Sequence, residues 1–123
     1  MKWIRSYRMR WHRRYWLARA WFRRGDLSCV VTRTKRLRPN DILCFTTLRN
    51  ERIRLPFFLK YYRAMGVKHF FFVDNDSDDG TDTYLEAQPD VSLWRTQASY
   101  KASAFGVDWL NRLKRRYAHG HWT

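Results

Sequence analysis

The chain has 123 residues, enough for one small domain, and carries a formal net charge of +14. Its two cysteines, Cys29 and Cys44, exclude a disulfide framework and lack the spacing of a metal site. Arginines interrupt residues 1–24 every few positions, so this segment contains no apolar run of signal-peptide length, and no stretch is long and apolar enough to span a bilayer.

The charge is unevenly distributed. Residues 1–40 hold 13 Lys/Arg and one acid, Asp26, whereas residues 41–123 are nearly balanced. This division predicts a basic arm and linker over residues 1–40, followed by a globular segment over residues 41–123. A basic arm favours anionic partners such as anionic lipid, nucleic acid or an acidic protein surface.

Residues 3–24 predict an amphipathic helix that ends at Gly25. Arginines fill most of one face, and the other face carries a stripe at spacings of three or four, formed by Trp3, Tyr7, Trp11, Tyr15, Ala18 and Phe22. Such a helix can lie flat on an anionic membrane. We therefore expect a cytoplasmic protein that can bind the inner face of the membrane. Alternatively, the stripe packs on the protein's own domain. A nucleic-acid partner is not expected, because no recognised RNA or DNA module accompanies the charge.

The rest of the chain predicts strands that alternate with helices. A linker with one short strand, "SCVVTR", leads into the first buried strand, and "HWT" at the end looks like the start of a further strand. Alternation of this kind predicts a parallel sheet with flanking helices. The expected strands are 42–48, 68–74 and 91–95, and the expected helices run from Pro56 to Gly66, over a short segment after Gly80, and over 103–118.

Polar residues gather after two of these strands. "TTLRNE", residues 46–51, closes the first strand, and "DNDSDDGT", residues 74–81, closes the second. In parallel sheets, ligands bind beyond the carboxyl ends of the strands. A calcium loop fits poorly, because Asp79 stands where the loop needs glycine and a buried strand precedes it. The aspartates can instead cap the following helix, since Gly80 permits a left-handed backbone.

The ordered pattern "TTLRNE", "FFLKYYRAMGVKHFFFVDNDSDDGT" and "DVSLWR" resembles the N-terminal half of bacterial family 2 glycosyltransferases with the GT-A fold. The resemblance covers about residues 41–123. It implies a Rossmann-like half-domain that binds a nucleotide-sugar donor, whose sugar the complete enzyme transfers to an acceptor hydroxyl. The alternative is a membrane-surface or nucleic-acid-binding module without catalysis.

The resemblance also implies roles for individual residues. Thr47, Asn50 and Glu51 would line the nucleotide pocket, and Asp74 or Asn75 would hydrogen-bond the nucleobase. Ser77 and Asp79, with Gly80 and Thr81, would shape the turn. A cation would face the diphosphate, and Lys101 is the first choice ahead of Arg95 and Arg112.

The chain departs from the family pattern at its end. The family's Asp-x-Asp motif, which holds the Mn²⁺ or Mg²⁺ expected for the full-length enzyme, would follow "HGHWT" and is absent, as is the family's general base. The residues 1–123 therefore predict donor binding with little or no sugar transfer, and no catalytic residue is assigned. A fragment of a longer protein and a degenerate remnant both fit this sequence.

Overall fold

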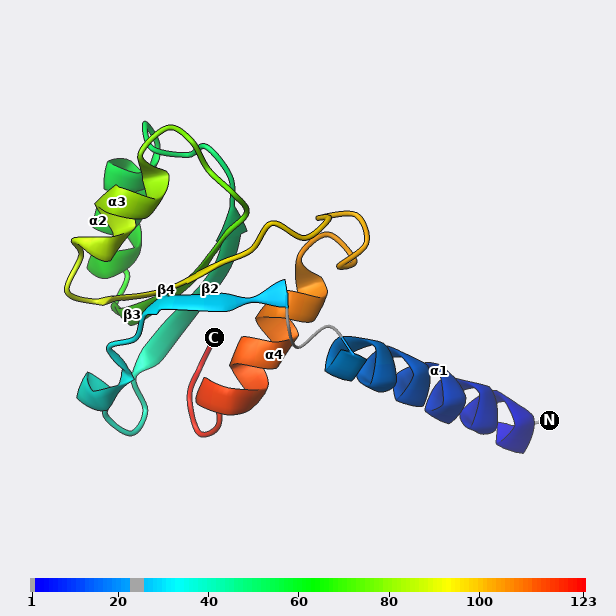
Figure 1. Cartoon of the computed structure of the whole chain (residues 1–123). Coiled ribbons are helices and arrows are strands. Elements are labelled where there is room, and N and C mark those ends of the chain that lie inside the picture. The colour runs from blue at the N-terminus through cyan, green and yellow to red at the C-terminus, as the bar shows by residue number, and fades with distance from the viewer. Residues whose placement is uncertain (1, 23–25) are drawn as a thin grey trace.

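The computed structural model describes residues 2–22 and 26–123 and shows a mixed α/β fold with one four-stranded sheet (Figure 1). The predicted strands and helices all form, with shifts at some of their ends. In chain order the elements are α1 (Lys2–Phe22), β1 (Ser28–Val31), the 3-10 turn η2 (Thr34–Arg36), β2 (Ile42–Leu48), α2 (Leu55–Ala64), β3 (Val67–Asp74), α3 (Thr81–Glu86), β4 (Val91–Arg95) and α4 (Val107–Tyr117).

The strands lie in the order β1-β4-β3-β2. The β2, β3 and β4 strands are parallel, as the alternation with helices predicts. The β1 strand runs antiparallel to β4, so the prediction of a fully parallel sheet is wrong. The reason is that β1 stands outside the alternating series: only η2 and short turns separate it from β2, and no helical crossover fixes its direction.

Hydrogen bonds fasten the end of β1 to the sheet. The backbone N–H of Arg33 donates to the Ser92 hydroxyl at 2.9 Å. Its guanidinium donates to the carbonyls of Val91 at 2.9 Å and Glu86 at 2.8 Å. The segment that the sequence assigned to a linker therefore contributes an edge strand to the globular domain.

Helices cover both faces of the sheet, with α2 and α3 on one side and α4 on the other (Figure 1). The "FFFV" run of β3 follows from this arrangement, because a strand covered on both faces needs apolar side chains in both directions. Phe70 and Phe72 pack in the cluster under α2 and α3, while Phe71 and Val73 pack in the cluster under α4. Each buried phenylalanine contributes roughly 1.5–3 kcal/mol of hydrophobic stabilisation.

In the sequence, helical spacing predicts one inward face formed by Phe58, Leu59, Tyr62 and Met65 and another formed by Val107, Leu110, Leu113 and Tyr117. Two of these side chains do not point inward. Val107 is half exposed and Met65 is 64% exposed. In the same helices the prediction is confirmed for Leu59 and Leu113, which are buried, and for Tyr117, whose ring lies 5.2 Å from that of Phe71. Met65 and Val107 each lie at a helix end, where the helical repeat that directs side chains inward stops.

The end of the chain lies beside β2. Trp122 forms a parallel bridge with Ile42, and its carbonyl accepts the N–H of Leu43 at 2.9 Å. "HWT" therefore begins to extend the sheet past β2, as its sequence predicts.

The α1 helix projects away from the sheet and approaches the domain only near α4 (Figure 1). Trp11 and Tyr15 are 69% and 60% exposed, so the interpretation that the aromatic stripe packs on the domain is wrong for these side chains. The side chains of Trp3 and Tyr7 and the predicted helix stop at Gly25 lie outside the described residues. Within the part of the chain that the structure describes, no helix is long and apolar enough to cross a membrane.

Candidate functional site

The two polar segments predicted to form a site meet at the carboxyl ends of β2 and β3. The N–H of Asn75 donates to the carbonyl of Leu48 at 2.8 Å, which holds the start of the acidic turn against the end of β2. The N–H of Asn50 donates to the Ser77 hydroxyl, and the Asn50 side chain accepts the N–H of Asp78, both at 2.9 Å. Asn50 adopts a positive φ of 52°, a conformation that asparagine tolerates better than most residues. Three predicted site residues, Asn50, Asn75 and Ser77, are thus brought together where hydrogen bonds join the two loops.

Asp74, the predicted nucleobase contact, is fully buried. One of its carboxylate oxygens accepts the Ser77 hydroxyl, and the other accepts the Ser77 N–H at 3.4 Å and lies 3.9 Å from Arg95 Nε. Burial raises the pKa of the Asp74 carboxyl, and the Ser77 hydrogen bonds and the Arg95 charge oppose that rise. The Asp74 side chain therefore lies inside the turn and holds Ser77 by hydrogen bonds. Its neighbour Asn75 is also buried.

Arg95, at the end of β4, offsets part of the charge of the acidic turn. Besides Asp74, its guanidinium contacts Asp76 and Asp82, each at 3.3 Å, and it donates to the Ser77 carbonyl at 3.3 Å. This network explains how acids concentrate at one turn without excessive repulsion. It also occupies Arg95, one of the cations considered for a diphosphate.

Asp79 joins the acidic turn to the loop after β2. Its carboxylate accepts the N–H of Arg52 at 3.1 Å, and the N–H and hydroxyl of Thr81 at 3.0 and 2.5 Å. The hydroxyl bond from Thr81 lowers the pKa of the Asp79 carboxyl, because it stabilises the charged form. The same Thr81 oxygen accepts the N–H of Glu51 at 3.1 Å. Asp79 and Thr81 therefore shape the turn at the start of α3, as the resemblance implied for them.

Thr47 has the most unusual environment in the candidate site. Its Oγ1 is buried and has no hydrogen-bond partner among the residues that the structure describes. Gly106, at the start of α4, lies directly against it, since a Cβ at Gly106 would come within 2.9 Å of that oxygen. Gly106 thus covers β2 at Thr47, near the carboxyl end of the strand. A buried hydroxyl without a partner is unfavourable, which makes Thr47 Oγ1 a group available to a ligand.

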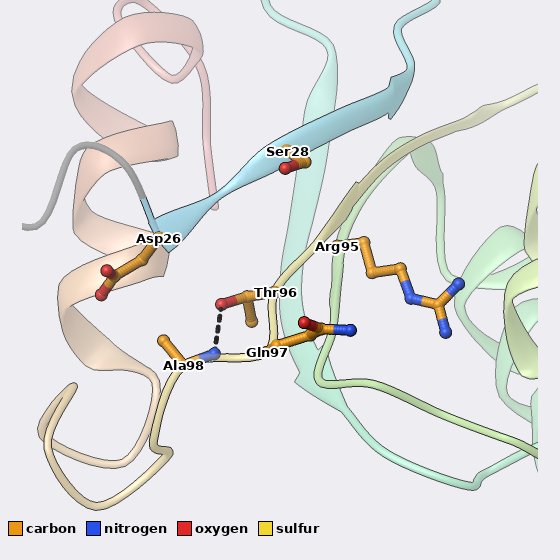
Figure 2. Close-up of a pocket in the computed structure, with 6 residues that line it drawn as sticks. All are labelled: Asp26, Ser28, Arg95, Thr96, Gln97 and Ala98. Atoms are coloured by element: carbon orange, nitrogen blue, oxygen red, sulfur yellow. Dashed lines mark hydrogen bonds between the residues drawn. The ribbon is translucent and has the colours of Figure 1, made fainter.

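Two cavities flank the carboxyl edge of the sheet. One of about 230 Å³ lies between β2 and α2 and includes both Thr47 and Glu51; it is lined by Thr46, Thr47, Leu48, Glu51, Arg54, Leu55, Phe58 and Phe72. A second of about 430 Å³ lies where β4 ends and β1 begins, and is lined by Asp26, Ser28, Arg95, Thr96, Gln97 and Ala98 (Figure 2).

The second cavity contains polar groups that the sequence analysis did not select. Figure 2 shows Asp26 and Gln97 at its walls, with Thr96 accepting the N–H of Ala98 at 3.1 Å. Thr96 and Gln97 follow the carboxyl end of β4, so the rule that selected the other two segments also identifies them. No pattern in the sequence identifies Asp26 as a residue of this cavity, because its position depends on the antiparallel pairing of β1 with β4.

Lys101 lies in the segment between β4 and α4 and is exposed. It lines neither of these two cavities. Its expected contact with a diphosphate stays a prediction.

No group of three or more His, Cys, Asp and Glu side chains that could hold a metal ion occurs within residues 2–22 and 26–123. Arg95 contacts two carboxylates of the acidic turn, Asp74 and Asp76, and that of Asp82 in α3. The Mn²⁺ or Mg²⁺ expected from the resemblance was assigned to a motif that this chain does not contain.

Comparison of the chain with known protein families, with curated proteins and with solved structures gave no match.

Proposed function

We propose that this chain is the donor-binding half of a glycosyltransferase, with a Rossmann-like GT-A architecture and a nucleotide-sugar as its ligand. The observation that carries the proposal is the meeting of the "TTLRNE" segment and the acidic turn at the carboxyl ends of two adjacent parallel strands. This is the edge at which open α/β sheets bind nucleotides, and the ordered motifs there resemble family 2 glycosyltransferases.

Within this proposal, the described residues divide into two groups. Hydrogen bonds join Asn50, Ser77 and Asp74, and Asp79 accepts the N–H of Arg52, so these four residues fix the shape of the pocket. Glu51 borders the smaller cavity and contacts the donor there, and Lys101 approaches its diphosphate from the segment after β4. The Thr47 hydroxyl lies on the α4 face of the same strand end, against Gly106, so the donor reaches that oxygen by displacing the chain around Gly106.

The reaction of the complete enzyme would transfer the sugar from its nucleotide diphosphate to an acceptor hydroxyl. A divalent ion would neutralise the leaving diphosphate there. Residues 1–123 supply neither that ion's ligands nor a general base, so the proposed activity of this chain is binding.

The test is thermal unfolding of the full chain with UDP, UDP-sugars and GDP-sugars. A ligand that binds only the folded state adds about 2.7 kcal/mol of stability at a hundredfold excess over its Kd. We expect one nucleotide class to raise the Tm and Thr47→Val to remove most of that rise. Thr47→Val by itself keeps or raises the Tm, because the hydroxyl that it removes has no partner to lose.

The matched control is Thr83→Val, which changes an exposed threonine on α3. It should leave the nucleotide-induced rise intact, whereas Lys101→Gln should reduce it. A chain that is folded by circular dichroism and shows no rise with any nucleotide would refute the proposal. An equal rise in Thr47→Val would refute the role of Thr47.

A further inference from the structure

The α1 helix presents large apolar side chains to solvent. Met9 and Trp11 are each 69% exposed and Tyr15 is 60% exposed. Trp11 and Tyr15 are four residues apart, so they stand one above the other on the same face of the helix.

Positive charge surrounds this aromatic face. The sequence from Lys2 to Phe22 contains seven basic residues and no Asp or Glu. Arg10 and Arg14, each exposed, directly precede Trp11 and Tyr15. Arginine side chains of this length can lay their apolar stems along a surface while the guanidinium reaches anionic groups.

The domain contacts α1 near the C-terminal end of the helix. Arg19 Nε lies 3.6 Å from the carboxylate of Asp108 in α4, and the Arg19 guanidinium also donates to the Ala102 carbonyl. Trp16 and Leu17 border a cleft between α1 and α4 of about 420 Å³. At about 3.6 residues per turn, Trp16 and Leu17 lie across the helix from Trp11 and Tyr15. The cleft therefore lies on the opposite side of α1, and the two exposed rings point away from it.

We propose that α1 docks the protein on an anionic phospholipid surface, with Trp11 and Tyr15 at the level of the headgroups and the arginines contacting lipid phosphates. Tryptophan and tyrosine favour this interface because each has an apolar ring and a polar group. The helix lies on the surface rather than crossing it, since no described helix is apolar enough to span a bilayer. Single-stranded nucleic acid would also meet arginine and aromatic groups, but an aligned aromatic face on a straight helix fits a flat surface better than a chain of bases.

The test is co-sedimentation of the full chain with vesicles of phosphatidylcholine alone or with about one third phosphatidylglycerol. We expect binding to the anionic vesicles only, weakening at high salt because ions screen the attraction. Trp11→Ser/Tyr15→Ser should weaken that binding by roughly tenfold or more, since it removes the inserted rings and leaves every charge. Arg10→Gln/Arg14→Gln should weaken it by a similar factor.

The matched control is Phe57→Ser/Tyr61→Ser, which removes an exposed aromatic pair of the same spacing from α2, where the side chains are 75% and 59% exposed. Its vesicle binding should be unchanged. Equal binding to neutral and anionic vesicles, no binding to either, or unchanged binding of Trp11→Ser/Tyr15→Ser would overturn the proposal. A single-stranded RNA that binds in preference to anionic vesicles would assign α1 to nucleic acid instead. The outcome is independent of nucleotide binding, which the Tm experiment reads.

Discussion

Arg95 shows how one residue determines what an acidic turn can do. Three carboxylates share its guanidinium, and the buried Asp74 is the innermost of them. Burial disfavours the Asp74 charge, and the nearby cation favours it, so the two influences on its pKa oppose each other. The turn is therefore a structural element in which Asp74 and Arg95 connect the ends of β3 and β4.

A second buried residue makes stability depend on pH. His69 is buried in β3, with Nε2 2.8 Å from the Ser92 hydroxyl, and burial lowers its pKa to about 4. Because the unfolded chain takes up a proton near pH 6.5 and the folded chain does not until about pH 4, the free energy of unfolding should fall as pH drops through this window, by up to about 3 kcal/mol. Urea unfolding at pH 7 and pH 4.5 measures the loss.

The control for this prediction is His69→Gln, which keeps a hydrogen-bonding side chain but does not titrate. Asp74 acts in the opposite direction, since its raised pKa favours the folded state as pH falls. The difference between the wild type and His69→Gln therefore isolates the histidine. Equal losses in both proteins would show that His69 does not carry the effect.

At the scale of elements, the segment between β4 and α4 determines access to Thr47. Ala104, Phe105 and Gly106 have consecutive positive φ angles of 52°, 57° and 80°, and this left-handed run explains why α4 begins at Val107 and not at Ser103. The run brings Gly106 against β2. The left-handed run thus explains both why α4 starts at Val107 and why the Thr47 hydroxyl is enclosed.

Gly106→Ala tests this contact. The new Cβ would lie 2.9 Å from Thr47 Oγ1 in a backbone conformation that alanine disfavours. We expect a loss of about 2–4 kcal/mol in the free energy of unfolding, from roughly 1–2 kcal/mol of backbone strain and a similar overpacking term. Gly120→Ala is the control, since φ is 79° there and nothing lies within 4 Å, so it should lose only the strain. Equal losses in the two variants would mean that residues 99–106 do not pack tightly on β2.

At the scale of the whole molecule, the basic arm contains two parts with different structural roles. The α1 helix touches the domain near α4, whereas β1 forms a complete edge of the sheet. Because an open strand edge promotes pairing with other chains, β1 protects β4. The division of charge in the sequence at residue 40 therefore does not coincide with a division in the structure.

Two truncated chains separate these roles. Residues 26–123 should unfold cooperatively, with a Tm within a few degrees of the full chain, because only the Arg19 contacts and the packing along α4 are lost. Residues 37–123 also lack β1 and the Arg33 hydrogen bonds, and should aggregate or lose more than about 10 °C, which corresponds to roughly 2 kcal/mol in a domain of this size. Circular dichroism and light scattering on heating provide the measurements. A Tm for residues 37–123 equal to that of residues 26–123 would show that β1 adds no stability.

The sequence by itself determined the elements and the edge at which polar residues gather. The "FFFV" run predicts a strand covered on both faces, and the alternation of strands with helices predicts that β2, β3 and β4 are parallel. Both are properties of local patterns, since side-chain periodicity and crossover length are encoded by neighbouring residues. The convergence of Asn50 with Ser77 follows from them, because the carboxyl ends of parallel strands lie together.

Only the tertiary structure decided which side chains remain available to a ligand. Asp74 and Thr47 both follow from strand ends in the sequence, yet one is buried among hydrogen-bond partners and the other is buried without one. That difference depends on Arg95 and Gly106, which approach from 21 and 59 residues away in the chain. The antiparallel direction of β1 was decided in the same way, because no local pattern fixes how a strand without a helical crossover meets a sheet.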